Sequence, residues 1–415
     1  MATLLLTFAI IGSLFVAFNN GANDVANAFA SAVGSKALKV KHALFVAACL
    51  NFIGAIVLGA NVSKMLVSGV VNVGNFGDVN GYIAGMLACM VASGTFMFVS
   101  TQTGLPVSST HSIVGSMIGV YIFSGGVDTV NWKSFSILAL TWMLTPFLSA
   151  LCSFSTIKLI RYTIYSGDRD KIMERAYKWI PLFVSIIIVA VIIAVAHGTR
   201  FGSCLSCGNS IFALVIIFLV FYVALKKFTK FLTTKFSNRE FGIEHVFKRF
   251  QAGTSCLIGF AVGSNDVANS VTPIVAIYFA LKLGHVPTSS ESFVIPVWLL
   301  ALGGLGMSVG VLSFGRKVIS TLGHGITVLT NSKGFAIDFS TAMTIIVASV
   351  FGIPVSSTHA STGSVIGVGL EKGIHNVNFG IILRIFATWL ITVPLSAIFA
   401  IVVFKFFLKV ASFFA

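Results

Sequence analysis

Long apolar stretches separated by short polar segments run through the whole chain. Eight stretches are uninterrupted and close to the roughly 20 residues that a helix needs to cross a bilayer; they lie near 42–60, 81–100, 135–157, 179–196, 211–225, 293–314, 336–351 and 381–404. Two more stretches contain a polar interruption, 1–35 at 19–27 and 251–280 at 264–270. Two further segments begin with a polar Gly-x-Pro sequence and then become apolar, 102–123 and 352–371. The pattern predicts about twelve transmembrane elements, four of them broken, including two re-entrant hairpins.

Charged residues are too few for a water-soluble protein. They make up 9% of the 415 residues, against about 25% in ordinary soluble domains. Hydrophobic residues make up 56%, and the mean hydropathy is +0.98. The composition excludes a soluble enzyme and predicts an all-α polytopic membrane protein.

The net charge of +15 does not indicate nucleic-acid binding, because the basic residues collect in short connecting loops and form no single face. Loops 161–178 and 226–249 hold five and seven of them, and two spans separate these loops. Both loops therefore lie on one side, which the positive-inside rule assigns to the cytoplasm. Counting back places Met1 outside the cell membrane. Residues 1–18 lack the basic start of a cleavable signal and are interpreted as the first span.

Two segments remain open to more than one interpretation. Aromatic residues alternate with the bases of loop 226–249, which fits an amphipathic helix on the inner leaflet and a solvated connector equally well. Cys204 and Cys207 lie in a polar loop, where a disulfide or no special role is favoured, because one pair supplies only half of a four-ligand zinc site. The other cysteines lie in apolar runs and are interpreted as packing residues.

Two motifs occur twice. Gly-Ala-Asn-Asp-Val-Ala-Asn at 21–27 returns with six of seven residues identical at 263–269, an offset of 242. Pro-Val-Ser-Ser-Thr-His at 106–111 returns unchanged at 354–359, an offset of 248. The predicted organisation is a first inverted repeat at 1–157, two linking spans with basic loops at 158–250, a second inverted repeat at 251–404 and a C-terminal tail at 405–415. An odd number of spans, seven, separates equivalent elements, so the second repeat is upside down, as in secondary transporters.

Each copy of the first motif places a carboxylate inside a span. Such a carboxylate costs roughly 2.5–3.5 kcal/mol even on the gentler insertion scales, and Asp24 and Asp266 are the only acidic residues that we place deep in the spans. Gly21 and Gly263 permit an unwound turn that exposes backbone carbonyl groups. Carboxylate, amide and carbonyl oxygens suit a small cation, and we predict its ligands to be Asn23, Asp24, Asn27, Asn265, Asp266 and Asn269. Capping of a helix restart is the alternative.

Each copy of the second motif places hydroxyl groups at a predicted helix start. Free backbone N–H groups and the positive end of the helix dipole attract anions there, so we predict anion binding by Ser108, Ser109, Thr110, Ser356, Ser357 and Thr358, beside Asp24 and Asp266. Neither motif contains Lys or Arg, so cations that travel with the anion would supply the countercharge. A carboxylate beside the anion favours an anion that can donate a proton to it. Phosphate carries such a proton near neutral pH, and sulfate does not. Ordinary capping is again the alternative.

Three neighbouring residues add little chemistry of their own. His111 and His359 make a Ser-His-Asp hydrolase conceivable, but the same set in both inverted halves suits a symmetric binding site and not one nucleophile with one base. We therefore expect no enzyme, and interpret both histidines as braces of the hairpins. Gln102, whose counterpart is Val350, is predicted to bind the ion or the anion on one side only; a packing hydrogen bond is equally consistent.

The two repeated motifs, in this order, resemble those of the inorganic phosphate transporter (PiT) family, and the match covers both halves. The resemblance implies sodium- or proton-coupled uptake of phosphate, with the Asn-Asp motifs and the hairpin serines at the site. Sulfate carriers belong to the same family. The large intracellular domain of some eukaryotic members is missing, and the short 226–249 loop looks prokaryotic.

The resulting hypothesis is a secondary active transporter that imports inorganic phosphate by symport with sodium and alternates access around a mid-membrane site. A proton-coupled phosphate or sulfate permease is the alternative, and an ion channel is a third reading. The expected partners are phosphate, sodium and the lipid bilayer, with no nucleic acid and no cofactor. Ion stoichiometry, affinity and a homodimeric state stay open.

Overall fold

The computed structural model describes residues 2–70, 78–103, 107–199, 209–235, 239–287, 294–322, 329–371, 373, 375 and 379–414. Its α-helices are α1 (Ala2–Gly34), α2 (Val40–Gly69), α3 (Val79–Thr103), α4 (Ser109–Gly125), α5 (Trp132–Ile160), α6 (Ile172–Gly198), α7 (Asn209–Lys235), α8 (Arg239–Leu283), α9 (Val297–Leu322), α10 (Asn331–Val350), α11 (Ser357–Leu370) and α12 (Phe379–Phe414). Ten of them are long and apolar enough to cross a membrane, all except the shorter α4 and α11. The predicted all-α polytopic fold with about twelve elements is confirmed.

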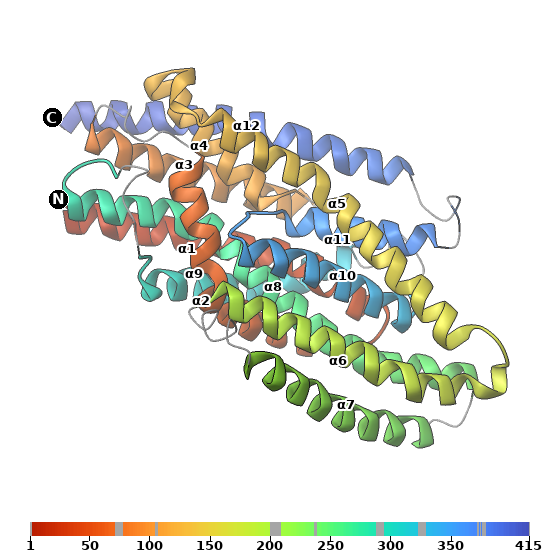
Figure 1. Ribbon diagram of the computed structural model, residues 1–415. Coiled ribbons are helices and arrows are strands. Elements are labelled where there is room, and N and C mark those ends of the chain that lie inside the picture. The colour runs from red at the N-terminus through yellow and green to blue at the C-terminus, as the bar shows by residue number, and fades with distance from the viewer. Residues whose placement is uncertain are drawn as a thin grey trace.

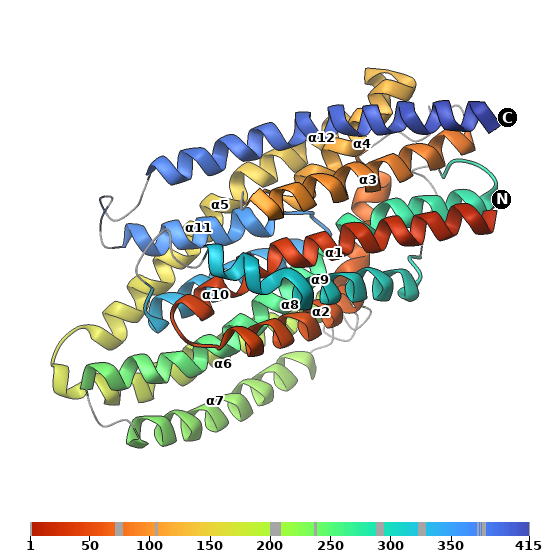
Figure 2. The same cartoon turned by 180° about the vertical axis from the view of Figure 1, so that it is seen from behind.

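The same order of elements occurs twice, in opposite directions. Helices α1 to α5 and α8 to α12 each contain two long helices, a hairpin and a further long helix. Both termini lie at one end of the molecule, while the turn between α5 and α6, the end of α7 and the start of α8 lie at the opposite end (Figures 1 and 2). We call this opposite end the basic end, because it carries both basic segments that the sequence analysis places on one side.

The motif helices are continuous, which corrects the prediction of unwound turns. Helix α1 runs through 19–27 and α8 through 264–270 without a break. Gly21 lets α1 pack closely against α9 and does not unwind the helix. A Cβ there would lie 2.0 Å from the carbonyl oxygen of Met307 in α9. At Gly263 a Cβ would lie 2.1 Å from the carbonyl oxygen of Asn51 in α2. Each glycine thus lets a helix of one repeat touch the backbone of the other repeat.

The breaks in the helices lie at the tips of the two hairpins, α3–α4 and α10–α11. Ser108 precedes α4 with φ −92° and ψ 119°, and Ser356 precedes α11 with φ −91° and ψ 118°. This near-identical extended geometry starts a new helix at the same motif position in each repeat. In the second hairpin, Gly352 has φ +69°, and a Cβ there would lie 2.9 Å from the carbonyl oxygen of Asn61, so both conformation and space require glycine.

The linking region is more helical than the sequence indicates. Most of segment 226–249 belongs to the end of α7 and the start of α8, and Leu232 is buried in a cluster with Val246, Phe247 and Phe250. Leu232 thus packs the end of α7 against the start of α8, while Phe228 and Phe231 are 43% and 60% exposed. The described part of the segment belongs to two long helices and is not a separate helix or loop. The predicted tail at 405–415 is helical through Phe414 as part of α12. Cys204 and Cys207 lie outside the described residues.

Candidate functional site

The two motif carboxyl groups meet inside the helix bundle. Asp24 of α1 and Asp266 of α8 are both fully buried, and their side chains are close neighbours. They come from inverted repeats and are 242 positions apart in the sequence. The crossing of α1 and α8 therefore concentrates two acidic groups in one buried place.

The hairpin hydroxyl groups surround these carboxyl groups. Ser109 Oγ donates to Asp24 Oδ2 at 3.2 Å, and Ser357 of the other hairpin lies near Asp266 without a hydrogen bond to it. Asn269 Nδ2 donates to Ser109 Oγ at 3.1 Å and to Thr110 Oγ1 at 3.3 Å. Each carboxyl group is thus matched with a serine at the start of a short helix.

The symmetry-related contacts in the other repeat belong to Asn27. Its Nδ2 donates to Thr358 Oγ1 at 2.8 Å and to Asp24 Oδ1 at 3.3 Å. Asn27 of the first repeat therefore contacts the second hairpin, while Asn269 of the second repeat contacts the first hairpin. We call the whole group the paired site; it contains Asn23, Asp24, Asn27, Ser108, Ser109, Thr110, Asn265, Asp266, Asn269, Ser356, Ser357 and Thr358.

The two hairpin tips are bonded to each other by their threonines. Thr110 Oγ1 donates to the carbonyl oxygen of Val355, and Thr358 Oγ1 donates to that of Val107, both at 3.3 Å. The preceding serines have capping roles: Ser108 Oγ accepts from the backbone N–H of His111 at 3.3 Å, and Ser356 Oγ accepts from that of His359 at 3.3 Å. The amino ends of α4 and α11 consequently converge on the paired site.

The electrostatics of the paired site combine oxygen acceptors with helix starts. Neither carboxylate oxygen of Asp266 receives a hydrogen bond from a described residue, although the side chain is fully buried. Buried polar atoms normally have partners, so these oxygens are suited to a bound cation. The first backbone N–H groups of α4 and α11 lack partners within their helices and are suited to an anion.

His111 and His359 brace the hairpins against the long helices α5 and α12. The His359 ring stacks on Trp389 with centroids 3.6 Å apart, and the His111 ring lies 4.1 Å from that of Trp142. His359 Nδ1 lies 2.9 Å from the carbonyl oxygen of Trp142, and His111 Nδ1 lies 3.3 Å from that of Trp389. Trp142 Nε1 also donates to the carbonyl oxygen of Pro354 at 3.2 Å. These contacts hold the tips in place.

Two of the predicted ligands bond outward to the hairpins. Asn23 Nδ2 donates to Thr101 Oγ1 at 3.3 Å. Asn265 Nδ2 donates to Ser349 Oγ at 3.1 Å and to the carbonyl oxygen of Ile353 at 3.3 Å. Both amides are buried, so their nitrogen atoms hold the hairpins while their oxygen atoms are left for other contacts.

Gln102 is not joined to the paired site by any hydrogen bond described in the structure. Its side chain is exposed, and its Oε1 accepts from Lys317 Nζ of α9 at 2.8 Å. The amide oxygen therefore makes a hydrogen bond between the hairpin and α9, which fits the packing role that the sequence analysis gives as the alternative.

A third buried carboxylate, Asp338 of α10, was not predicted. It is fully buried and accepts hydrogen bonds from Ser31 Oγ of α1 and, at 2.6 Å, from Ser255 Oγ of α8. This corrects the expectation that Asp24 and Asp266 are the only acidic residues deep in the spans. Its counterpart at the 248 offset is Met90, so no repeated motif marked the position.

Comparisons with known proteins agree on one family. The phosphate transporter family matches residues 20–400. A protein of Pyrococcus abyssi named as a candidate phosphate permease is 35% identical over 405 residues, which cover 96% of this chain and 97% of that protein. Inorganic phosphate transporter 2-1 of Arabidopsis thaliana, a chloroplast protein, is 34% identical over 441 residues, covering all of this chain and 74% of that protein.

A solved structure is also similar over nearly the whole chain. A protein described as the sodium-dependent phosphate transporter is 36% identical, with a TM-score of 0.90, and the match covers 98% of this chain and 99% of that one. The helix order, the opposed hairpins and the doubled motifs are thus accompanied by similarity in sequence and in fold. This chain belongs to the phosphate transporter family.

Proposed function

We propose that this protein imports inorganic phosphate by symport with sodium ions, as a secondary active transporter that alternates access around the paired site. The observation that carries the proposal is the contact between two buried carboxyl groups and two helix starts with their hydroxyl groups. The similarity to a sodium-dependent phosphate transporter supports the choice of both passengers.

The proposed cation ligands are the oxygen atoms of Asp24 and Asp266, helped by the side-chain oxygens of the four motif asparagines. Two buried carboxylates in contact repel each other and are costly without a compensating charge. A sodium ion at each carboxylate would remove this cost. Sodium would therefore bind before or together with the anion, since without it the paired site is too negative.

The proposed phosphate contacts are the helix starts and hydroxyl groups of the two hairpins. Backbone N–H groups at the amino ends of α4 and α11 would bind phosphate oxygens, and Ser109 and Ser357 can turn their hydroxyl groups toward it. Protonated phosphate can in turn donate a hydrogen bond to Asp24 or Asp266. Sulfate cannot make this last bond at neutral pH, which favours phosphate.

Charge balance limits the stoichiometry. An inside-negative potential contributes about 2.3 kcal/mol per elementary charge per 100 mV, but only if net positive charge moves inward. A phosphate monoanion then requires at least two cations and a dianion at least three. We expect a multi-pass protein of a prokaryotic cell membrane with its termini outside, so that sodium and phosphate enter from that side.

The decisive experiment measures uptake of radiolabelled phosphate into proteoliposomes under three imposed gradients. We expect a sodium gradient to drive saturable uptake, and a potassium gradient of equal size to drive none. A proton gradient without sodium separates the proposal from its nearest rival, since a proton could also neutralise the carboxyl pair. Uptake driven fully by protons in the absence of sodium would overturn the sodium assignment, and unitary currents without saturable coupled flux would indicate a channel.

A further inference from the structure

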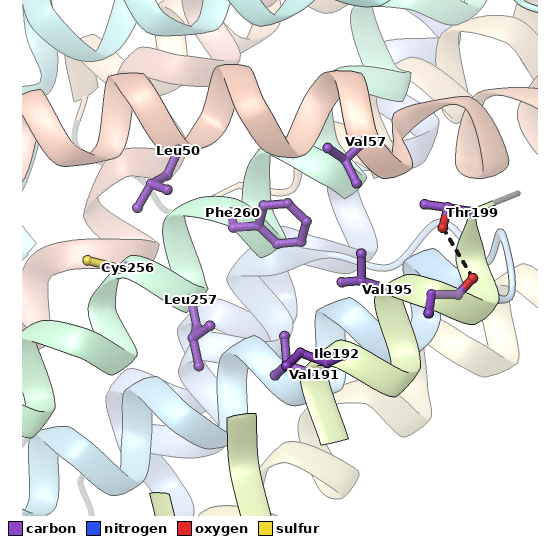
Figure 3. Close-up of a pocket in the computed structure, with 10 residues that line it drawn as sticks. Leu50, Val57, Val191, Ile192, Val195, Thr199, Cys256, Leu257 and Phe260 are labelled. Carbon is purple, nitrogen blue, oxygen red and sulfur yellow. Dashed lines mark hydrogen bonds between the residues drawn. The ribbon is translucent and has the colours of Figure 1, made fainter. Parts of the chain in front are cut away.

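An apolar groove lies between the linking helix α6 and the repeat helices α2 and α8. It has a volume of about 610 Å³, roughly four times that of an engineered apolar cavity of about 150 Å³ that stays dry and takes up benzene. Figure 3 shows Leu50 and Val57 of α2 on one side, Val195 of α6 on another, and Phe260 of α8 between them. The groove is distinct from the paired site and plays no part in the proposed transport chemistry.

The lining of the groove excludes water and polar ligands. Its polar side chains are satisfied locally: Thr199 Oγ1 donates to the carbonyl oxygen of Ala196 at 3.1 Å, and Cys256 Sγ contacts that of Ala252 at 3.2 Å. A buried water needs two to four polar partners, which these walls do not offer. All ten lining residues are half-buried and none is fully enclosed, so the space is open to its surroundings. In a membrane those surroundings are hydrocarbon.

The groove continues toward a cation at the basic end. Arg249, Gly253, Cys256, Leu257 and Phe260 are spaced so that they share one face of α8. A Cβ at Gly253 would have no heavy atom within 4 Å, so the face is open between Arg249 and the groove. Arg249 is exposed and forms no ion pair with a described residue.

The dimensions of this face match one leaflet of a bilayer. From Arg249 to Phe260 is 11 residues, or about 16 Å along the helix, and half of the hydrocarbon core of a bilayer is about 15 Å thick. A lipid with its phosphate at Arg249 would therefore have an acyl chain of the right reach to fill the groove. The basic end is also the side that the charge bias assigns to the cytoplasm.

We propose that the groove between α2, α6 and α8 binds one phospholipid of the leaflet at the basic end, with its phosphate at Arg249 and one acyl chain against Val195, Leu257 and Phe260. The acyl chain fills a space between the linking helix and both repeats that no side chain occupies. The lipid thereby fills the part of the contact between α6 and the repeats where side chains do not meet.

Lipid binding to the purified protein tests this proposal. The protein is stripped of lipid in detergent and titrated with phosphatidylglycerol, and the first binding step is followed by native mass spectrometry. We expect Arg249→Gln to weaken this step about fivefold, which corresponds to the roughly 1 kcal/mol of one basic residue near an anionic headgroup. Lys230→Gln, at an exposed lysine of α7, is the matched control and should bind as the wild type does.

Filling the groove tests the acyl-chain contact separately. Val195→Trp should weaken the first step by about tenfold or more, because it removes the space of several CH₂ groups. Leu219→Trp, at a half-exposed position of α7 (50%), is the control for added bulk. If Val195→Trp fails to elute as a folded protein in size-exclusion chromatography, Ala196→Phe replaces it.

Two further probes each lack one part of a phospholipid, either the phosphate or the acyl chains. Diacylglycerol lacks the phosphate and should bind as weakly to the wild type as phosphatidylglycerol binds to Arg249→Gln. Inorganic phosphate lacks the chain and should not displace the lipid. Equal binding by the wild type and the groove-filling variant, binding unchanged in Arg249→Gln, or displacement by inorganic phosphate would each overturn the proposal.

Discussion

The residues with the largest expected effect on transport are the two carboxyl groups that meet in the paired site. Asp24→Asn and Asp266→Asn each keep the side-chain volume and remove the negative charge. Each variant would leave the proposed buried sodium ion without its carboxylate countercharge, at a cost of roughly 3–5 kcal/mol, so we expect sodium-driven phosphate uptake to fall by more than about 100-fold. Uptake by each variant in proteoliposomes is the measurement.

The matched control for these variants is Asp128→Asn, because Asp128 is exposed on a short connecting turn. It should transport phosphate at the wild-type rate. Wild-type uptake by both Asp24→Asn and Asp266→Asn would reject the assignment of the paired site.

Asp338 offers a test of stability at the residue scale. Asp338→Ala would leave the buried hydroxyl group of Ser31 without its acceptor, while Ser255 Oγ would keep the carbonyl oxygen of Gln251 at 2.8 Å as an acceptor. The orphaned hydroxyl group costs about 1–3 kcal/mol, so the midpoint of thermal unfolding in detergent, followed by tryptophan fluorescence, should fall. The exposed Asp128→Ala should leave the midpoint unchanged, and an equal midpoint for both variants would show that these hydrogen bonds do not contribute.

Asp24 and Asp266 are predictable from the sequence as site residues, whereas Asp338 is not. Asp24 and Asp266 were found because their neighbours repeat at a fixed offset, and the inverted topology then predicts that they meet. Asp338 stands alone in an apolar run, and its partners come from α1 and α8, far away in the sequence. A contact made only by tertiary packing leaves no local pattern.

Among the elements, α1 crosses α9 and α8 crosses α2 with backbone contacts at glycines, Gly21 and Gly263 among them. Gly21→Ala and Gly263→Ala would each push a Cβ to about 2 Å from a backbone oxygen of the neighbouring helix. Backbone oxygens cannot move aside as a side chain can, so we expect a loss of about 1–3 kcal/mol, visible as a lower midpoint of thermal unfolding.

Another glycine of α8, Gly253, is the control for these variants. Gly253 has no neighbour within 4 Å of an added Cβ, so Gly253→Ala should be neutral or stabilising by up to about 1 kcal/mol, since alanine favours the helix. A decrease at Gly253 equal to that at Gly263 would mean that helix contact is not the reason for the glycines.

These glycines also show why the predicted helix breaks were misplaced. Glycine next to asparagine and aspartate fits an unwound turn and a close helix crossing equally well, and only the neighbouring helix decides between them. The hairpin breaks were predictable, because Gly-x-Pro followed by Ser-Ser-Thr carries both a stop and a capping signal. The gap between α3 and α4 and that between α10 and α11 lie where these signals are.

For the whole molecule, the structure implies that both termini lie on one side of the membrane, and the basic loops predict that this side is the outside. Peptide tags fused before Ala2 and after the C-terminus should therefore both react with an antibody added to intact cells. A tag inserted in the α5–α6 turn, for example after Gly167, should react only after permeabilisation. Reaction of the two terminal tags only in permeabilised cells would reverse the orientation.

The crossed bonds between the hairpin tips have a consequence for the origin of the molecule. Thr110 and Thr358 each complete the backbone of the opposite hairpin, so a protein made of one half would have neither a closed tip nor a second carboxylate. Such an ancestor could have worked only as a pair of identical chains inserted in opposite orientations. Gene fusion across an added pair of helices would then have preserved in one polypeptide what had depended on dual insertion.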